Sequence, residues 1–342
     1  MTYSLEIADF QTIESEWERL LPHSTANNIF LTHYWQRTWW ESMKPPGQTL
    51  RIVRLVEGGN TIGIAPLSFH QGMVTFLEGP DLWDTHDFIV LRGREDSFFQ
   101  ALLSYLEGEE WREIRLESLV EESTAISHLL PLALERGYRA EKEVEGHLMG
   151  VPLPGTWEEY LMGLRKKDRH ELRRKLRRLE GEVDFRVEQL SDVRSVSGAM
   201  DDFLHLMAQS REEKSQFLTA ERGSFFRDVA LELAQRGLIQ VFFLEVGGVR
   251  TAATVCFDYN NVRSLYNSGH NKEYASLGTG FLLNALCLKR AIGEGKEYFD
   301  LLRGTEPYKQ HLGASGRELY RLSLFRQGES AVELYQWSGL PS

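Results

Sequence analysis

The sequence predicts an α/β (α+β) chain of two tandem domains, each with a mixed, mostly antiparallel sheet flanked by helices. Its 342 residues are enough for about two domains of ordinary size. A pattern of an apolar run, a Gly-Gly pair and a second apolar run occurs twice, 189 residues apart. Residues 1–150 hold 12 basic and 24 acidic residues, whereas residues 151–342 hold 27 and 26. The change falls at the Pro- and Gly-rich stretch 151–155, which predicts domains 1–150 and 151–342.

Each copy of the repeat predicts a β-hairpin, because glycine accepts positive φ without a Cβ clash. The turns are Gly58-Gly59 and Gly247-Gly248. The first half predicts a helix over 34–43, a hairpin over 50–69 and a strand over 74–79. The second half predicts a helix over 200–218, strands over 238–246, 249–259 and 262–268, a helix over 277–292 and a strand over 297–302. The matching order of elements indicates a structural duplication.

Composition excludes several classes of protein. No stretch approaches the roughly 20 apolar residues of a membrane helix, and the first residues carry acids where a signal peptide needs basic and apolar runs. Cys256 and Cys287 are too few for a disulfide scaffold or a four-cysteine zinc site, and no metal-ligand spacing is present. The net charge of -11 argues against DNA binding. We expect a cytoplasmic protein with buried free thiols, no metal, no membrane span and no DNA partner.

Chemistry is expected where the helix over 277–292 begins. Gly278 and Gly280 let a ligand approach the backbone closely. Free N–H groups at a helix start favour an anion, and a pyrophosphate is the obvious candidate. The alternative is that these residues serve only to start the helix and bind no ligand.

Polar groups also follow the predicted strand over 297–302. Asp300 or Glu306 could accept a proton from a nucleophile, and Tyr308 or Lys309 could donate a proton or bind an anionic substrate. The alternative is a solvated loop in which Arg303 pairs with Glu306.

A strongly basic segment begins the second half. Nine of the fourteen residues 165–178 are Lys or Arg. The segment predicts one amphipathic helix, because leucines recur at helical spacing at Leu161, Leu164, Leu172, Leu176 and Leu179. Arg169 and Arg173, one turn apart, could bind one phosphate of a substrate or of RNA. Two alternatives to a phosphate-bearing partner stay open. The helix could carry a solvated basic face and pack on the acidic first half, or it could attach to a membrane surface.

In the first half, a polar cluster precedes an apolar strand over 88–91. Asp84, His86 and Asp87 are candidates for substrate binding, because two carboxylates and a histidine at a strand start could line a cleft. Turn capping is the alternative.

These motifs together resemble the GNAT-superfamily acyltransferases of the CelD-like group, found near bacterial polysaccharide-synthesis genes. The matching features span nearly the whole chain: an RxxWW-type helix at 37–40, GGNTIGIAPL at 58–67, an Asp-rich strand at 84–90, the basic helix at 164–180, LYNSGHNKEYASLGTGFLL at 265–283 and FDLLRGTEPYKQHLG at 299–313. The group is related to Fem-type peptidyltransferases, which carry two tandem GNAT folds. The resemblance implies a degenerate first GNAT-like domain and a catalytic second one.

The resemblance also implies that acyl-CoA binds with its pyrophosphate on the Gly-rich loop and its pantetheine arm between the strands 262–268 and 297–302. The implied cofactor-binding residues are Asn267, Ser268, Gly269, Leu277, Gly278, Thr279 and Gly280. A backbone N–H within 267–269 would polarise the thioester carbonyl. The Gln or Arg that begins the family's loop pattern is absent here, where Tyr274 and Ala275 stand.

The function implied is an acyl-CoA-dependent N- or O-acyltransferase, using acetyl-CoA in the simplest case. An amine or hydroxyl of a sugar or other small, phosphate-bearing metabolite would attack the thioester directly, with Asp300 or Glu306 as base. Arg303, Arg169 and Arg173 would contact the substrate. Two alternatives stay open: an aminoacyl-tRNA-dependent peptidyltransferase of Fem type, favoured by the basic helix and the tandem fold, and a non-catalytic GNAT-fold binding protein, favoured by the incomplete loop pattern.

Overall fold

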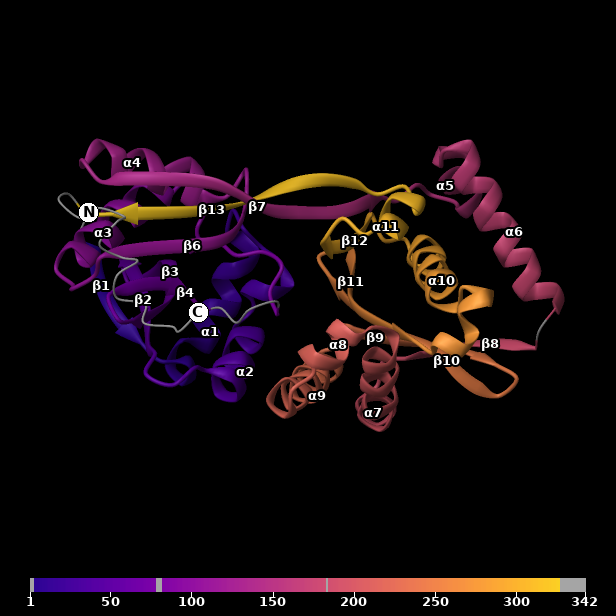
Figure 1. Ribbon diagram of the computed structural model, residues 1–342. Helices are drawn as coiled ribbons and strands as arrows, with labels where there is room; N and C mark the ends of the chain where they lie inside the picture. Colours follow the sequence, from indigo (N-terminus) through magenta and orange to yellow (C-terminus); the bar gives the residue numbers. More distant parts are fainter. Residues whose placement is uncertain (1–2, 78–81, 183, 327–342) are drawn as a thin grey trace, which may run out of the picture. The chain divides into compact units, whose positions relative to one another are not determined.

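The computed structural model describes residues 3–77, 82–182 and 184–326, which form two compact units (Figure 1). Unit 1 comprises the described residues of 1–40, 44–146 and 318–342, and unit 2 comprises those of 41–43 and 147–317. The chain leaves unit 1 along β7 (Arg139–Pro152) and returns along β13 (Ser315–Phe325). This differs from the expected bounds 1–150 and 151–342. The Pro- and Gly-rich stretch lies within unit 2. Pro152 is the last residue of β7, a position where the strand does not need the N–H that proline lacks.

Unit 1 is a mixed sheet with helices on both faces. Its neighbouring strands are β1 (Tyr3–Ala8), β2 (Thr49–Glu57), β3 (Asn60–His70), β4 (Met73–Phe76), β6 (Glu113–Val120) and β13, and the short β5 (Ile89–Val90) pairs with β3. All pair antiparallel except β4 with β6. Its helices are α1 (Phe10–Leu20), α2 (His33–Met43), α3 (Glu95–Glu107) and α4 (Leu130–Glu135), with shorter turns at Leu21–His23, Ile29–Leu31 and Ala125–Leu129.

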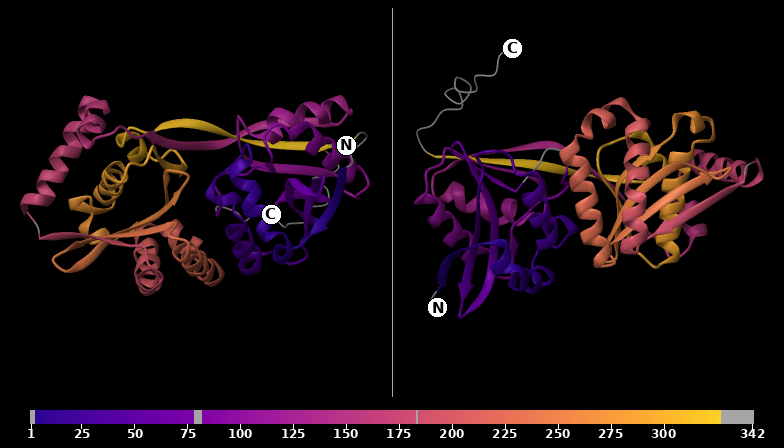
Figure 2. Two further views of the ribbon diagram at one scale, coloured as in Figure 1. Left: turned by 180° about the vertical axis from the view of Figure 1, so that it is seen from behind. Right: turned by 90° about the horizontal axis from the view of Figure 1, so that it is seen from below.

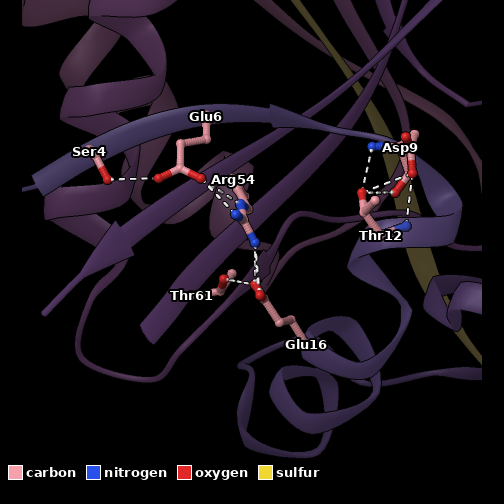
Figure 3. Close-up of polar contacts among 7 residues, drawn as sticks. All are labelled: Ser4, Glu6, Asp9, Thr12, Glu16, Arg54 and Thr61. Carbon is pink, nitrogen blue, oxygen red and sulfur yellow. Dashed lines mark hydrogen bonds and ion pairs between the residues drawn. The ribbon is translucent and has the colours of Figure 1, made fainter. Parts of the chain in front are cut away.

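A polar network joins four elements of unit 1 (Figure 3). Arg54 of β2 donates to Glu6 of β1 with Nη2 at 2.6 Å and to Glu16 of α1 with Nη1 at 2.7 Å. Thr61 of β3 donates to the same Glu16 carboxylate. The Asp9 side chain caps the start of α1. One guanidinium therefore fixes where α1 lies against the edge of the sheet, because its planar fork satisfies two carboxylates at once.

Unit 2 is built on the strand order β7-β12-β11-β10-β9-β8. The strands are β8 (Phe185–Leu190), β9 (Ile239–Val246), β10 (Val249–Tyr259), β11 (Val262–His270) and β12 (Tyr298–Arg303), and only β11 and β12 pair parallel. Its helices are α5 (Trp157–Gly163), α6 (Lys166–Glu182), α7 (Val193–Ser210), α8 (Glu212–Phe217), α9 (Ala220–Gln235), α10 (Thr279–Gly293) and α11 (Pro307–His311), and a 3₁₀ turn (Lys272–Leu277) precedes α10. Figures 1 and 2 show α5, α6 and α10 on one face and α7, α8 and α9 on the other.

The two units repeat one topology, which confirms the predicted duplication. In each, an antiparallel hairpin (β2-β3 or β9-β10) is followed by a third strand, a helix and a strand parallel to the third. Both parallel strands are also bulged, and each bulge holds a non-glycine residue with positive φ, Ser118 at 60° and Leu302 at 59°. A shared irregularity of this kind indicates a common structural plan beyond hairpin similarity.

Some predicted elements have different bounds. The basic segment is two helices, because Leu164 is extended between α5 and α6. The helix expected over 200–218 breaks at Arg211, which is extended between α7 and α8. Apolar spacing identifies the buried face correctly in both cases, but it does not detect a break within a continuous stripe. The strand expected over 88–91 is shorter, and residues 78–81 of the predicted strand and loop lie outside the described residues.

Both thiols, Cys256 on β10 and Cys287 on α10, are free and fully buried, as expected. Every helix within the described residues is too short or too polar to cross a bilayer.

Gly269 of β11 lies where α7 crosses the sheet. A Cβ at this position would stand 2.2 Å from the backbone nitrogen of Met207. The helix therefore contacts the strand backbone directly, and this close approach requires glycine.

We predict that Gly269→Ala lowers the free energy of unfolding by about 2 kcal/mol or more, because the α7 backbone has to move. Gly198→Ala in the same helix is the matched control, since no atom lies within 4 Å of its Cβ position. The control should keep or raise stability, by about 0.5–1 kcal/mol. Urea unfolding followed by circular dichroism measures both, and equal effects would contradict the close packing.

Candidate active site

A cavity of about 280 Å³ opens in unit 2 at the start of α10. Four parts of the fold form its wall: the start of α10, the end of β11, the segment after β12 and the junction of α7 with α8. The lining residues are Ser210, Arg211, Lys214, Ser268, His270, Ala275, Gly278, Thr279, Gly280, Phe281, Asn284, Glu306 and Tyr308. The structure therefore brings the Gly-rich turn and two of the predicted catalytic residues together.

The start of α10 is built to receive a polar ligand. Gly278 has φ +67°, a left-handed conformation that suits glycine, and no side chain caps the helix there. Thr279 is 1% exposed, and its Oγ1 has no hydrogen-bond partner among the described residues. Buried hydroxyls are rarely left unpaired, and helix starts carry N–H groups without intrahelical partners. The amides and the Thr279 hydroxyl therefore suit an anionic ligand.

Two basic side chains of α6 lie beside this loop. Lys175 Nζ would be 3.3 Å from a Cβ on Gly278, and Arg178 Nη1 donates to the Ser276 carbonyl at 3.2 Å. The sequence analysis did not identify Lys175 and Arg178 as candidates for this site, although their spacing of three residues puts them on one helix face.

The predicted pair Arg169 and Arg173 does not reach the cavity. Arg169 Nη1 donates to the carbonyl oxygens of Met162 and Leu164 at 3.2 and 3.4 Å, where it closes the end of α5, and Arg173 is exposed. The spacing identified the helix correctly but selected the wrong face, because the register of α6 is set by its buried leucines.

Glu306 and Tyr308 give the cavity wall a proton acceptor and a proton donor. Burial raises the pKa of the Glu306 carboxyl, but the Lys309 charge and hydrogen bonds outweigh burial and hold that pKa below its usual value. Burial raises the pKa of the Tyr308 phenol well above its usual value. At neutral pH Glu306 is therefore a carboxylate and Tyr308 a neutral phenol, the complementary states that acid–base catalysis needs.

Lys309, a predicted catalytic residue, is buried next to the cavity and is not among the lining residues. It is 2% exposed, and its Nζ donates to the carbonyl oxygens of Leu302, Arg303 and Gly304 at 3.3, 2.6 and 3.2 Å. The same ammonium lies 3.0 Å from Glu306 Oε2. Because an ammonium has three donors, these carbonyls engage all of them. Lys309 therefore holds the end of β12 and positions Glu306.

Asp300 and Arg303 lie outside the cavity lining. The Asp300 carboxylate accepts the Leu302 N–H at 2.8 Å inside the β12 bulge, and its backbone pairs with Ser264 of β11. Of the two predicted bases, the structure brings only Glu306 to the cavity.

The strands β11 and β12, between which the resemblance implies a cofactor groove, are paired over only part of their length. They pair only from Val262–Tyr298 to Ser264–Asp300. The Ser268 N–H, one of the implied carbonyl-polarising groups, is bonded to its neighbour Asn267 Oδ1 at 2.9 Å. This donor is therefore already engaged.

Three cavity residues were not found from the sequence: Arg211, Lys214 and His270. Burial, with the nearby Arg211 charge, lowers the pKa of Lys214 to about 8. Burial, with the charges of Lys214 and Arg211, lowers the pKa of His270 as well. The wall formed by α8 is thus strongly positive. No motif marks these residues, because the α7–α8 junction and the end of β11, more than fifty residues apart in the sequence, bring them together.

The first-half candidates form part of the unit 1 core. Asp87 is 4% exposed and accepts hydrogen bonds from the N–H groups of Phe88 and Thr124, both at 2.8 Å. His86 is also buried, with its ring centroid 4.5 Å from that of Trp83, while Asp84 is half-buried. For Asp87 the structure supports the capping alternative: its carboxylate closes the turn at 125–129.

Within the described part of the chain, no three His, Cys, Asp or Glu side chains converge as metal ligands would.

Comparisons with known proteins agree with this geometry. Residues 166–310, which lie within unit 2, match the family described as "Acetyltransferase (GNAT) domain". No curated protein matches the chain in sequence.

Solved structures share the fold along nearly the whole chain. FemX aligns with a TM-score of 0.65 and 12% identity, over 97% of this chain and 99% of its own. A conserved protein of unknown function from Bacteroides thetaiotaomicron aligns at 0.62 and 11%, over 95% and 100%. A tandem GNAT protein from the clavulanic acid biosynthesis pathway aligns at 0.52 and 12%, over 96% and 100%. The fold is therefore a tandem GNAT arrangement.

We predict that Lys214 loses its proton with a midpoint of about 8, because burial and Arg211 disfavour its ammonium form. Amine-reactive pulse labelling between pH 6.5 and 10.5, read by mass spectrometry, measures the midpoint, with urea-unfolded protein as the control near 10.5. Stability should also rise with pH across this window, since only the unfolded chain still binds the proton. A folded-state midpoint near the control value would contradict the prediction.

Proposed function

We propose that unit 2 transfers an acyl group from acyl-CoA, acetyl-CoA in the simplest case, to an amine or hydroxyl of a small acceptor. The observation that carries the proposal is the uncapped start of α10, where the buried Thr279 Oγ1 has no partner among the described residues. Lys175 and Arg178 lie at the same loop. Backbone amides, a hydroxyl and two cations together fit the diphosphate of coenzyme A. The match of residues 166–310 to an acetyltransferase domain supports this reading.

Glu306 and Tyr308 supply the proton transfers. The acceptor nitrogen or oxygen attacks the thioester carbonyl carbon, so that a C–N or C–O bond forms and the C–S bond breaks. Glu306 takes the acceptor's proton, and Tyr308 gives a proton to the departing sulfur. Lys309 keeps Glu306 at the cavity wall. Each positioned acid or base of this kind contributes about 10²- to 10⁴-fold in rate.

Unit 1 is proposed to be a degenerate copy without a cofactor site. Its α3 corresponds in order to α10, but the acidic Glu95 stands at the first helical position. The Glu95 carboxylate is 8% exposed and accepts the Thr25 hydroxyl at 2.6 Å. A built-in carboxylate at a helix start occupies the position that an incoming phosphate would take and repels it. Only unit 2 leaves that position open.

The proposed setting is cytoplasmic polysaccharide biosynthesis, with a sugar or similar metabolite as acceptor, supported by the resemblance to the CelD-like group.

A second candidate, an aminoacyl-tRNA-dependent peptidyltransferase, is favoured by the likeness to FemX and by exposed cations such as Lys166 and Arg173 on α6. Salt-sensitive tRNA binding without acetyl-CoA binding would select it.

We predict that Thr279→Val raises the Kd for acetyl-CoA about 5- to 10-fold, because it removes one hydrogen bond without changing the side-chain shape. Thr156→Val is the control, since it removes the hydroxyl that caps α5 away from the cavity. Isothermal titration calorimetry measures both variants. No heat from folded wild-type protein at millimolar acetyl-CoA would reject the cofactor.

We predict that Glu306→Gln lowers kcat at least 100-fold and leaves the Kd for acetyl-CoA within twofold, because the amide cannot take a proton. Tyr308→Phe should lower kcat without removing the fall of kcat at low pH, which reports Glu306. Acetyl-CoA-dependent thiol release with a panel of amino sugars gives the rates. Full activity in both variants would contradict the roles of Glu306 and Tyr308, whereas no thiol release by the wild-type protein with any acceptor would favour the non-catalytic alternative.

A further inference from the structure

The cavity holds more positive charge than the proposed diphosphate loop uses. Arg211 and Lys214 line the wall formed by α8. Arg211 lines the same cavity as Glu306 and Tyr308, the two groups proposed to transfer protons. Among the described residues, no hydrogen bond or ion pair engages the Arg211 guanidinium. It is therefore available to a ligand.

Lys214 is held in place beside it. Its Nζ donates to Asn267 Oδ1 at 2.8 Å and to the Ser268 carbonyl. Both partners are neutral, so they orient the ammonium group without cancelling its charge. The lysine therefore adds a fixed positive charge to the same wall.

The one carboxylate on the cavity wall does not balance these cations. Glu306 carries one negative charge and faces three cations: Lys309, whose ammonium lies 3.0 Å away, and the nearby Arg211 and Lys214. Arg211 is exposed and Lys214 is half-buried. The wall therefore has a net positive charge, which attracts an anionic ligand.

The diphosphate of the cofactor has separate partners. Lys175, Arg178 and the start of α10 lie at the Gly-rich loop, whereas Arg211 belongs to the junction of α7 with α8. Lys175 and Arg178 are not among the cavity-lining residues, so one positive region lies beside the Gly-rich loop and the other on the cavity wall. Two such regions indicate two anionic groups, only one of which is the diphosphate.

We propose that the acceptor carries a carboxylate or phosphate next to the amine or hydroxyl that is acylated, and that Arg211 and Lys214 bind this anionic group. This inference rests on the proposed function. It narrows the acceptors to amino acids, sugar phosphates and compounds of the same charge pattern. The positive wall also disfavours the ammonium form of an acceptor amine, as it does for Lys214, so the attacking nitrogen is more readily neutral.

The test compares acceptors that differ only in the anionic group. The pairs are glucosamine with glucosamine 6-phosphate, and serinamide with serine, so that phosphate and carboxylate are probed separately. Acetyl-CoA-dependent thiol release gives kcat/KM for each. We expect one charged member to exceed its neutral partner at least 10-fold. Arg211→Gln should remove most of that preference and leave the Kd for acetyl-CoA within twofold.

Arg227→Gln on α9 is the matched control, because it makes the same charge change at an exposed ion pair with Asp201. Lys214→Arg keeps the charge and should retain the preference. Weaker acetyl-CoA binding in Arg211→Gln, or a preference for the neutral acceptors, would overturn the proposal. Calorimetry with glucosamine 6-phosphate and serine alone separates it from the proposed function: binding lost in Arg211→Gln supports the anion site even if acetyl-CoA does not bind. No binding of either probe at millimolar concentration overturns it.

Discussion

The buried ammonium of Lys309 is the contact on which the geometry of the cavity depends. Its three hydrogen bonds hold the carbonyl groups at the end of β12, where Leu302 keeps a left-handed backbone. The same group neutralises Glu306. Without it, Glu306 would lose its ion-pair partner, and the carbonyl groups at the end of β12 would lose their hydrogen-bond donor. A residue with no direct access to substrate thus determines which charges the substrate meets.

Under the proposed function, one topology keeps a binding site in unit 2 and closes it in unit 1. Both have a hairpin, a third strand, a helix and a bulged parallel strand. The difference lies at one helix start, where unit 1 has Glu95 with Thr25 as its partner and unit 2 has Thr279 beside two glycines. Folding requires only the apolar pattern, which both halves retain, so chemistry at the helix start can change without loss of the fold.

The sequence predicts the fold and the Gly-rich end of the cavity, because hairpin glycines and apolar periodicity are local signals. The sequence does not show which of the two predicted bases, Asp300 or Glu306, reaches the cavity. The outcome depends on the β12 bulge, which holds Asp300 away from the cavity and whose carbonyl groups bind Lys309. The sequence analysis assigns Asp87 to a substrate, although the Thr124 amide that this carboxylate caps lies 37 residues away. The sequence does not identify Arg211 and Lys214 as cavity residues, because the apolar pattern does not reveal the helix break at Arg211. That break brings the two side chains to the end of β11, more than fifty residues later in the sequence.

The crossing of the chain has a consequence for its synthesis. Residues 319–325 of β13 pair with β6 in unit 1, but the ribosome makes all of 147–317 between them. The β6 edge consequently lacks its last partner for about 200 residues of translation, or roughly 10–40 s at about 5–20 residues per second. Unit 2 has all its strands before unit 1 does. Unit 2 can therefore fold first, and unit 1 keeps an open sheet edge until β13 has been made.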